Sequence, residues 1–173
     1  MPVSEGDKVG EDLSIEFSKI GVIETPYEKT APYQPFENDE NNFRIKVDPQ
    51  YESGLYMLDS FKYIYLLYYI DRLNEKEDLI FNPEWAEEIR VGIFASRAPG
   101  RPNPIGLSVT AIKKIEGNII YTTGLDVFNG TPLLDIKPYI KDLDTKAEAN
   151  FGWLSELGDK GHFAKHLMGI PHD

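Results

Sequence analysis

Two arginines stand four residues apart in a stretch, Val91 to Ser108, that also contains three prolines. Arg97 and Arg101 each present planar pairs of N–H donors, which suit a carboxylate or a phosphate. The prolines restrict the backbone, and a restricted loop loses less entropy when it closes on a ligand. The pattern predicts a preorganised anion-binding loop. The alternative is a rigid surface corner whose arginines pair with nearby acids.

A second stretch, Gly124 to Tyr139, places carboxylates beside turns. Asp126 follows an expected strand and precedes a glycine turn, a place from which a carboxylate can face a ligand. Asp135 and Lys137 alternate with apolar neighbours, so they share one face of a short expected strand. They could also form nothing more than a local ion pair, which contributes about 0–1 kcal/mol when exposed.

Composition limits the classes of function. The chain has 173 residues, the length of one domain, and no cysteine, which excludes disulfides, thiolate metal sites and cysteine nucleophiles. Eighteen basic and 29 acidic side chains give a net charge of −11, which argues against a general nucleic-acid coat. Residues 89–115 nevertheless contain no Asp or Glu and carry a net +5, which suggests that an anion is bound locally.

Short apolar runs separated by turn residues predict a mostly β chain, folded as a barrel or a sandwich. Strands are expected within 13–25, 43–47, 62–70, 90–94, 105–115, 119–127 and 133–136, a long loop at 28–43, and one helix at 145–157, which Gly152 weakens. Phosphate-binding glycine motifs are absent, so a doubly wound nucleotide fold is not expected. We expect a flexible acidic tail at 1–12, a barrel domain at 13–145 and a helical or irregular extension at 146–173.

Two further patterns have simple structural explanations. His162 and His166 have the i, i+4 spacing of zinc ligands, but no third ligand is evident, and we expect no metal site. The tyrosines of 63–69 could stack on bases, although a buried strand with one tyrosine-rich face is the stronger interpretation. The start of the chain lacks a secretory signal, and the longest apolar run is far below the ~20 residues that span a bilayer. A soluble, cytoplasmic protein is therefore expected.

Two ordered motifs identify a resemblance to a known family. They are RPNPIGLS at 101–108 and GTPLLDIKPY at 130–139, supported by 20–23, 64–67 and 91–97. The sequence resembles the TsaA-like (YaeB, VirR) family, whose best-understood members are the TrmO-type tRNA methyltransferases. The resemblance covers roughly residues 18–145.

The resemblance implies a single-domain β-barrel that binds S-adenosylmethionine, as a homodimer with the cofactor near the interface. It also implies N6-methylation of threonylcarbamoyl-adenosine at tRNA position 37. Carried over by position, the implied cofactor contacts are Pro32, Tyr33, Gln34, Asp71, Arg72, Arg97, Leu107, Asp126, Val127, Phe128 and Asn129. Substrate contacts are expected from Arg101, Asn103, Lys137 and Tyr139.

The chemistry of these side chains agrees with that cofactor. Its carboxylate suits Arg97, its adenine suits an aromatic or apolar wall, and its amine and hydroxyls suit Asp71 or Asp126. The departing proton of the acceptor amine needs a base, for which Asp126 and Asp135 are the candidates. Two alternatives stay open: a small-molecule methyl acceptor, which the acidic surface favours, and a non-catalytic protein that binds S-adenosylmethionine.

Overall fold

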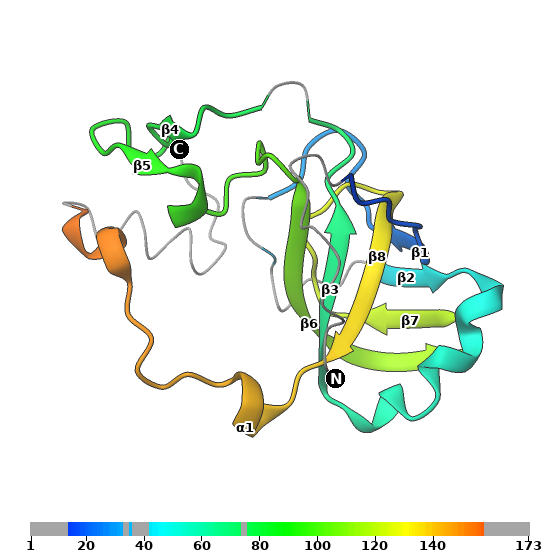
Figure 1. Ribbon diagram of the computed structural model, residues 1–173. Helices are drawn as coiled ribbons and strands as arrows, with labels where there is room; N and C mark the ends of the chain where they lie inside the picture. Colours follow the sequence, from blue (N-terminus) through cyan, green and yellow to red (C-terminus); the bar gives the residue numbers. More distant parts are fainter. Residues whose placement is uncertain (1–13, 33–34, 36–41, 74–75, 158–173) are drawn as a thin grey trace, which may run out of the picture.

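The computed structural model describes residues 14–32, 35, 42–73 and 76–157, and six of its strands close into a barrel. The strands are β1 (Gly21–Glu24), β2 (Phe43–Val47), β3 (Tyr63–Tyr69), β6 (Ile105–Glu116), β7 (Ile119–Thr122) and β8 (Thr131–Pro138). They pair antiparallel in the order β1-β2-β7-β6-β3-β8, and β8 pairs with β1 to complete the ring (Figure 1). The expected mostly β fold is confirmed.

Alternation along the strands separates the barrel interior from its outer face. Ile64, Leu66 and Tyr68 on β3 point inward and are buried, whereas Tyr63 and Tyr69 are exposed. This is the buried strand with one tyrosine-rich face that the sequence favours. The interior is filled by the buried apolar cluster Ile23, Phe43, Ile45, Val47, Ile64, Leu66, Tyr68, Ile120, Leu125, Val127 and Leu133. Closure of the ring leaves no unpaired sheet edge around this core.

A small lobe beside the barrel consists of a two-stranded sheet, β4 (Ile80–Phe81) and β5 (Val91–Gly92), and a 3-10 turn, η3 (Ile93–Ala95). Ala86, Val91 and Ile93 are buried there but do not belong to the barrel cluster, so the lobe has an apolar centre of its own. The proline-rich loop at 96–104 leads from this lobe back into β6 (Figure 1).

The remaining elements are short. Two 3-10 helices, η1 (Pro49–Leu55) and η2 (Leu58–Ser60), connect β2 to β3, where no helix is expected from the sequence. After β8 come one helical turn, α1 (Lys141–Asp144), and a 3-10 helix, η4 (Gly152–Glu156). No described helix is long and apolar enough to cross a membrane.

Four expected elements are wrong in extent, of which the strand at 133–136 is longer than expected, at Thr131–Pro138, and the other three are shorter. The helix at 145–157 is reduced to η4: the backbone is already extended at Thr145, and Gly152, with a φ of +56°, departs from the right-handed path where η4 begins. The strand at 119–127 ends at Thr122, after which Leu125 and Val127 leave the ladder and pack into the core. The strand at 90–94 ends at Gly92, where η3 begins. The tail at 1–12 and the histidines at 162 and 166 lie outside the described residues.

Gly106 offers a test of the barrel's packing. A Cβ on this residue would lie 2.0 Å from Cε2 of Tyr68, so Gly106→Ala must displace a buried ring. We expect a loss of about 1–3 kcal/mol in the free energy of unfolding, measured by urea denaturation. Gly54→Ala is the matched control, because a Cβ there has nothing within 4 Å. Equal urea midpoints for the two variants would contradict the packing.

Candidate functional site

Asp126, Ser108 and Tyr68 form a hydrogen-bonded chain that links three parts of the barrel. Ser108 Oγ lies 3.1 Å from the Tyr68 hydroxyl oxygen and donates to Asp126 Oδ1 at 3.5 Å. Tyr68 and Ser108 come from the paired strands β3 and β6, and Asp126 comes from the connection between β7 and β8. Because Ser108 and Tyr68 both occupy inward positions, the barrel wall itself positions the Asp126 carboxyl.

The electrostatics of this chain set Asp126 apart from the other carboxylates. Burial raises the pKa of Asp126 above its usual value, and a backbone hydrogen bond, the Ser108 hydroxyl and the charge of Arg97 each oppose the rise. Burial likewise raises the pKa of Tyr68 to about 12. Asp126 therefore holds a proton more readily than an ordinary aspartate, and an exposed guanidinium, that of Arg97, lies within electrostatic reach of it.

Arg72, which follows β3, joins a second group of the predicted residues. Its Nη2 donates to the Asn129 carbonyl oxygen at 2.6 Å, and its guanidinium carbon lies 5.8 Å from the centre of the Phe128 ring. Its Nε lies 4.0 Å from Asp71 Oδ2. The fold thus brings together Asp71, Arg72, Phe128 and Asn129, although Asp71 and Phe128 are 57 positions apart in the sequence.

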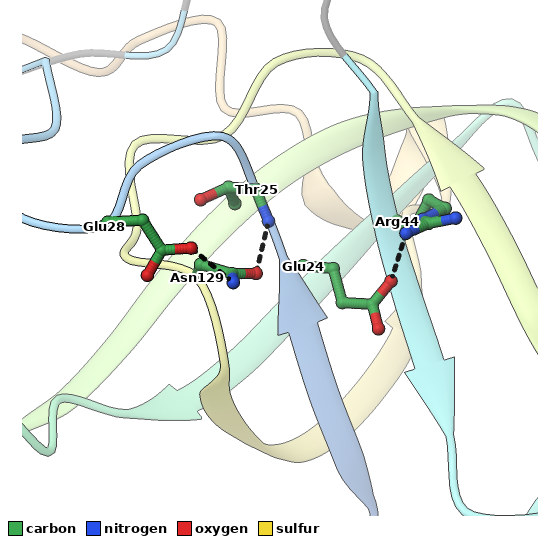
Figure 2. A network of polar contacts seen from close by, with 5 residues as sticks. All are labelled: Glu24, Thr25, Glu28, Arg44 and Asn129. Carbon is green, nitrogen blue, oxygen red and sulfur yellow. Dashed lines mark hydrogen bonds and ion pairs between the residues drawn. The ribbon is translucent and has the colours of Figure 1, made fainter.

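Asn129 fixes the turn after Asp126 against the segment that follows β1 (Figure 2). Its Oδ1 accepts from the Thr25 backbone N–H at 3.2 Å, and its Nδ2 donates to Glu28 Oε1 at 2.8 Å. Thr25 Oγ1 also donates to the Val127 carbonyl at 2.8 Å. These contacts attach the start of the Pro32 loop to the 126–129 turn. Tyr33 and Gln34, also predicted cofactor contacts, lie outside the described residues.

The two arginines of the proline-rich loop behave differently. Arg101 Nη1 donates to the carbonyl oxygens of Ile93 and Ser96, at 3.1 and 2.8 Å, and its guanidinium carbon lies 5.8 Å from the centre of the Phe94 ring. Arg101 Nη1 thus stabilises a rigid corner, as in the alternative, but its partners are backbone carbonyls and not the nearby acids that the alternative expects. Arg97 is exposed and acts electrostatically on Asp126.

Three other predicted residues belong to β8 or follow it: Asp135 and Lys137 lie on the strand, and Tyr139 comes directly after it. Asp135 Oδ2 pairs with Lys137 Nζ at 2.7 Å, and its Oδ1 accepts from the Ile136 N–H at 2.9 Å. This is the local ion pair given as the alternative, and it leaves Asp135 without a link to the Asp126 chain. Tyr139 packs against Tyr65, with ring centres 5.4 Å apart.

Leu107 and Asn103 are both exposed. Leu107 occupies an outward position on β6, whereas its neighbour Ser108 points inward toward Asp126. Within one chain, Leu107 therefore faces away from the group around Asp126. The Asn103 carbonyl accepts from the Ile105 N–H at 2.8 Å, which closes a tight turn where β6 begins.

The basic segment at 89–115 is not one patch in the folded chain. Arg97 and Arg101 precede β6, whereas Lys113 and Lys114 lie near its far end, beyond about 26 Å of extended strand. Lys114 Nζ pairs there with Glu116 Oε1 at 2.8 Å. Among the described residues, no cluster of three or more His, Asp or Glu side chains could hold a metal ion.

Sequence reasoning did not single out Tyr68 and Ser108 as members of the site. The available signal is the alternation of β6 itself, in which the small or polar residues Gly106, Ser108 and Thr110 point inward and the apolar residues between them point outward. That signal becomes specific only when the β3–β6 register is known, because Tyr68 and Ser108 are 40 positions apart.

Comparison with known proteins agrees with this architecture. Residues 22–145 match the family described as the tRNA-methyltransferase O N-terminal domain. A probable S-adenosyl-L-methionine-binding protein from Pyrococcus abyssi is 38% identical, over 83% of this chain and 78% of its own. A tRNA (adenine(37)-N6)-methyltransferase from Escherichia coli K12 is 30% identical, over 79% of this chain and 63% of its own.

The fold is shared as well as the sequence. The crystal structure of TrmO from Pseudomonas aeruginosa superposes with a TM-score of 0.67 at 28% identity, over 81% of this chain and 62% of that one. This chain thus spans less than two thirds of the bacterial proteins but more than three quarters of the Pyrococcus relative. Because the family match covers most of the described residues and the barrel carries its motifs, the chain belongs to the tRNA-methyltransferase O N-terminal domain family.

Proposed function

We propose that this protein is an S-adenosylmethionine-dependent methyltransferase that acts on N6 of threonylcarbamoyl-adenosine at tRNA position 37. The observation that carries the proposal is the Tyr68–Ser108–Asp126 hydrogen-bonded chain, which joins the two sequence motif regions beside the Arg72–Phe128–Asn129 group. Membership of the family and the names of the Pyrococcus and E. coli relatives support it. A tRNA-modifying activity also fits the cytoplasmic location expected from the sequence.

The residues present suit the cofactor. Arg97 supplies a guanidinium for its carboxylate, and the exposed carboxylate of Asp71 can accept from its amine. Phe128 offers an aromatic face, and Val127 contributes to the buried wall of the same turn. S-Adenosylmethionine supplies a methyl group already activated by its sulfonium, so the protein needs no nucleophile of its own.

Asp126 is the proposed acceptor of the proton that leaves the amine. A carboxyl whose pKa is raised by burial is a stronger base than an ordinary aspartate, which favours general-base catalysis. Ser108 donates to Asp126 Oδ1 and so orients the carboxyl. Asp135 is the weaker candidate, because both of its oxygens already accept from neighbours on β8.

A homodimer would explain the position of Leu107. Ile105, Leu107 and Val109 on β6 are 38%, 55% and 45% exposed, and they pair in register with Tyr69, Leu67 and Tyr65 of β3. We propose that this apolar outer face packs against a second copy of the chain. Leu107 would then contribute to the partner's cofactor site, and two subunits could combine their basic loops into one groove for tRNA.

The net charge of −11 favours a second candidate, a methyl acceptor that is small and not polyanionic. The two candidates share the cofactor site but differ in the acceptor. Mass mapping of tRNA nucleosides from a deletion strain distinguishes them. Loss of the methyl group at position 37, restored by the wild-type gene, supports tRNA, whereas unchanged nucleosides reject it.

Arg97→Ala tests the cofactor site. Because the variant loses a charged hydrogen-bond partner, we expect the Kd for S-adenosylmethionine to rise by about 10- to 100-fold in calorimetry. Arg90→Ala, an exposed arginine of the same basic segment, is the matched control and should bind like the wild type. Absence of binding by the wild-type protein would refute the proposed cofactor, and retained binding by Arg97→Ala would refute the role of Arg97.

Asp126→Asn tests the half-buried Asp126 carboxyl through the pH dependence of stability. The pKa of Asp126 is raised in the folded state, so its contribution is fully present at low pH and is lost as pH rises through that raised pKa. The neutral amide avoids this loss. We expect Asp126→Asn to gain in free energy of unfolding over the wild type between pH 4 and pH 8. A stability difference that does not change with pH would contradict burial as the cause.

Leu107→Asp tests the proposed interface. A carboxylate in the centre of an apolar contact loses its hydration without a partner, so the variant should sediment as a monomer while the wild type sediments as a dimer. Leu143→Asp is the control, because Leu143 is 65% exposed on α1 and should leave the dimer intact. A wild-type monomer at micromolar concentration would contradict the interface.

A further inference from the structure

The segment after α1 returns to the small lobe and attaches to it through an aromatic stack. Trp153 on η4 stacks on Trp85, with ring centres 5.6 Å apart and planes at 21°. Its Nε1 also donates to the Ala95 carbonyl at 2.8 Å, across 58 positions of sequence. Leu157, at the end of η4, is buried. Figure 1 shows η4 (orange) beside the β5–η3 end of the lobe (green), although the two segments are distant in the sequence.

The side chains of Arg101 and Ser96 also stabilise η3, the turn to which Trp153 donates. Arg101 Nη1 donates to the carbonyl oxygens of Ile93 and Ser96, which flank Ala95. Ser96 Oγ donates to the Ile93 carbonyl at 3.0 Å and accepts from the Ala98 N–H at 3.3 Å. Three carbonyls in four residues therefore accept side-chain donors, immediately before Arg97.

Such convergence has a physical consequence for Arg97. An exposed arginine has many rotamers, and its guanidinium can be aimed only if the backbone that carries it is fixed. The loop from 96 to 104 has three prolines and no strand pairing, and its middle is fixed where the Gly100 carbonyl accepts from the Glu77 N–H at 2.9 Å. The residues before Gly100, Arg97 among them, depend on contacts where the loop joins η3. Arg101 and Trp153 supply those contacts at the end that carries Arg97.

We infer that Gly152–Leu157, named here the clamp, positions Arg97 by holding η3, so that Trp153 and Arg101 are positioning residues for the cofactor. The inference rests on the proposed function for its ligand. By linkage, a clamp that favours cofactor binding must itself be stabilised when the cofactor binds. Loss of the clamp should therefore lower the affinity for the cofactor, even though the side chains proposed to contact the cofactor are unchanged.

The first test needs no cofactor. Trp153→Phe keeps a ring on Trp85 but removes the Nε1 donor, and Trp153→Ala removes both. Amide hydrogen exchange at residues 94–101 should become faster in Trp153→Phe and faster still in Trp153→Ala, while exchange in β3 and β8 stays at the wild-type rate. The unchanged barrel rates show that the variants fold. Wild-type exchange at 94–101 in Trp153→Ala would overturn the inference.

The second test measures binding. Loss of one exposed hydrogen bond predicts a Kd for S-adenosylmethionine about two- to tenfold weaker in Trp153→Phe. The chain has only two tryptophans, which form this stack, so its near-ultraviolet circular dichroism reports the clamp directly. Saturating S-adenosylmethionine should strengthen that signal in the wild type and leave it unchanged in Arg97→Ala.

The outcomes separate the two proposals. Wild-type affinity in both Trp153 variants would overturn the clamp and leave the proposed function intact. Absence of cofactor binding by the wild type would overturn the proposed function, and with it a clamp that serves a cofactor, even if the variants exchange faster. If S-adenosylmethionine leaves the dichroism signal of the wild type unchanged while the Kd still rises in the Trp153 variants, the linkage is overturned. The clamp would then be a purely structural contact.

Discussion

The contact of Tyr68 with Gly106 is the packing constraint on which the site depends. The ring occupies space that any side chain at 106 would fill, so β3 and β6 approach closely at this point. That approach brings the Tyr68 hydroxyl to Ser108, two residues further along β6, and Ser108 in turn reaches Asp126. A half-buried carboxyl is costly without partners, and the barrel wall supplies one in Ser108. The same strand pair presents its opposite face, with Leu107, to the outside.

Two kinds of loop meet at this end of the barrel, and each is fixed differently. The 126–129 turn is held to the segment after β1 by the Asn129 side chain and by Thr25 (Figure 2). The 96–104 loop is held by its own Arg101 and, through the lobe, by Trp153. Arg97 belongs to the second of these loops and remains exposed although the loop is anchored, an arrangement that suits a group that must meet a ligand.

Strand periodicity in the sequence identified most of the barrel, because alternation of apolar side chains depends only on near neighbours. Residues 43–47 and 62–70 are examples, and the structure has strands at Phe43–Val47 and Tyr63–Tyr69. Prediction from periodicity was wrong where tertiary packing overrides the local sequence pattern. Leu125 and Val127 read as strand residues but pack into the core beyond the ladder, and Gly152 adopts a positive φ inside an expected helix. Arg101 has the chemistry of an anion ligand, yet backbone carbonyls of its own loop accept its donors.

The sequence by itself determined the types of group available: arginines in a stiff loop, a carboxylate before a glycine turn, no thiol, and an acidic total interrupted by one basic segment. Tertiary structure decided which of them act together. It divided the basic segment between two ends of β6, separated Asp135 from Asp126, and joined Tyr68, Ser108 and Asp126 within electrostatic reach of Arg97. The reason is that burial and hydrogen bonding, which set the pKa of Asp126, depend on strand register: Ser108 is 18 positions from Asp126 and 40 from Tyr68, and no local pattern encodes how these residues align.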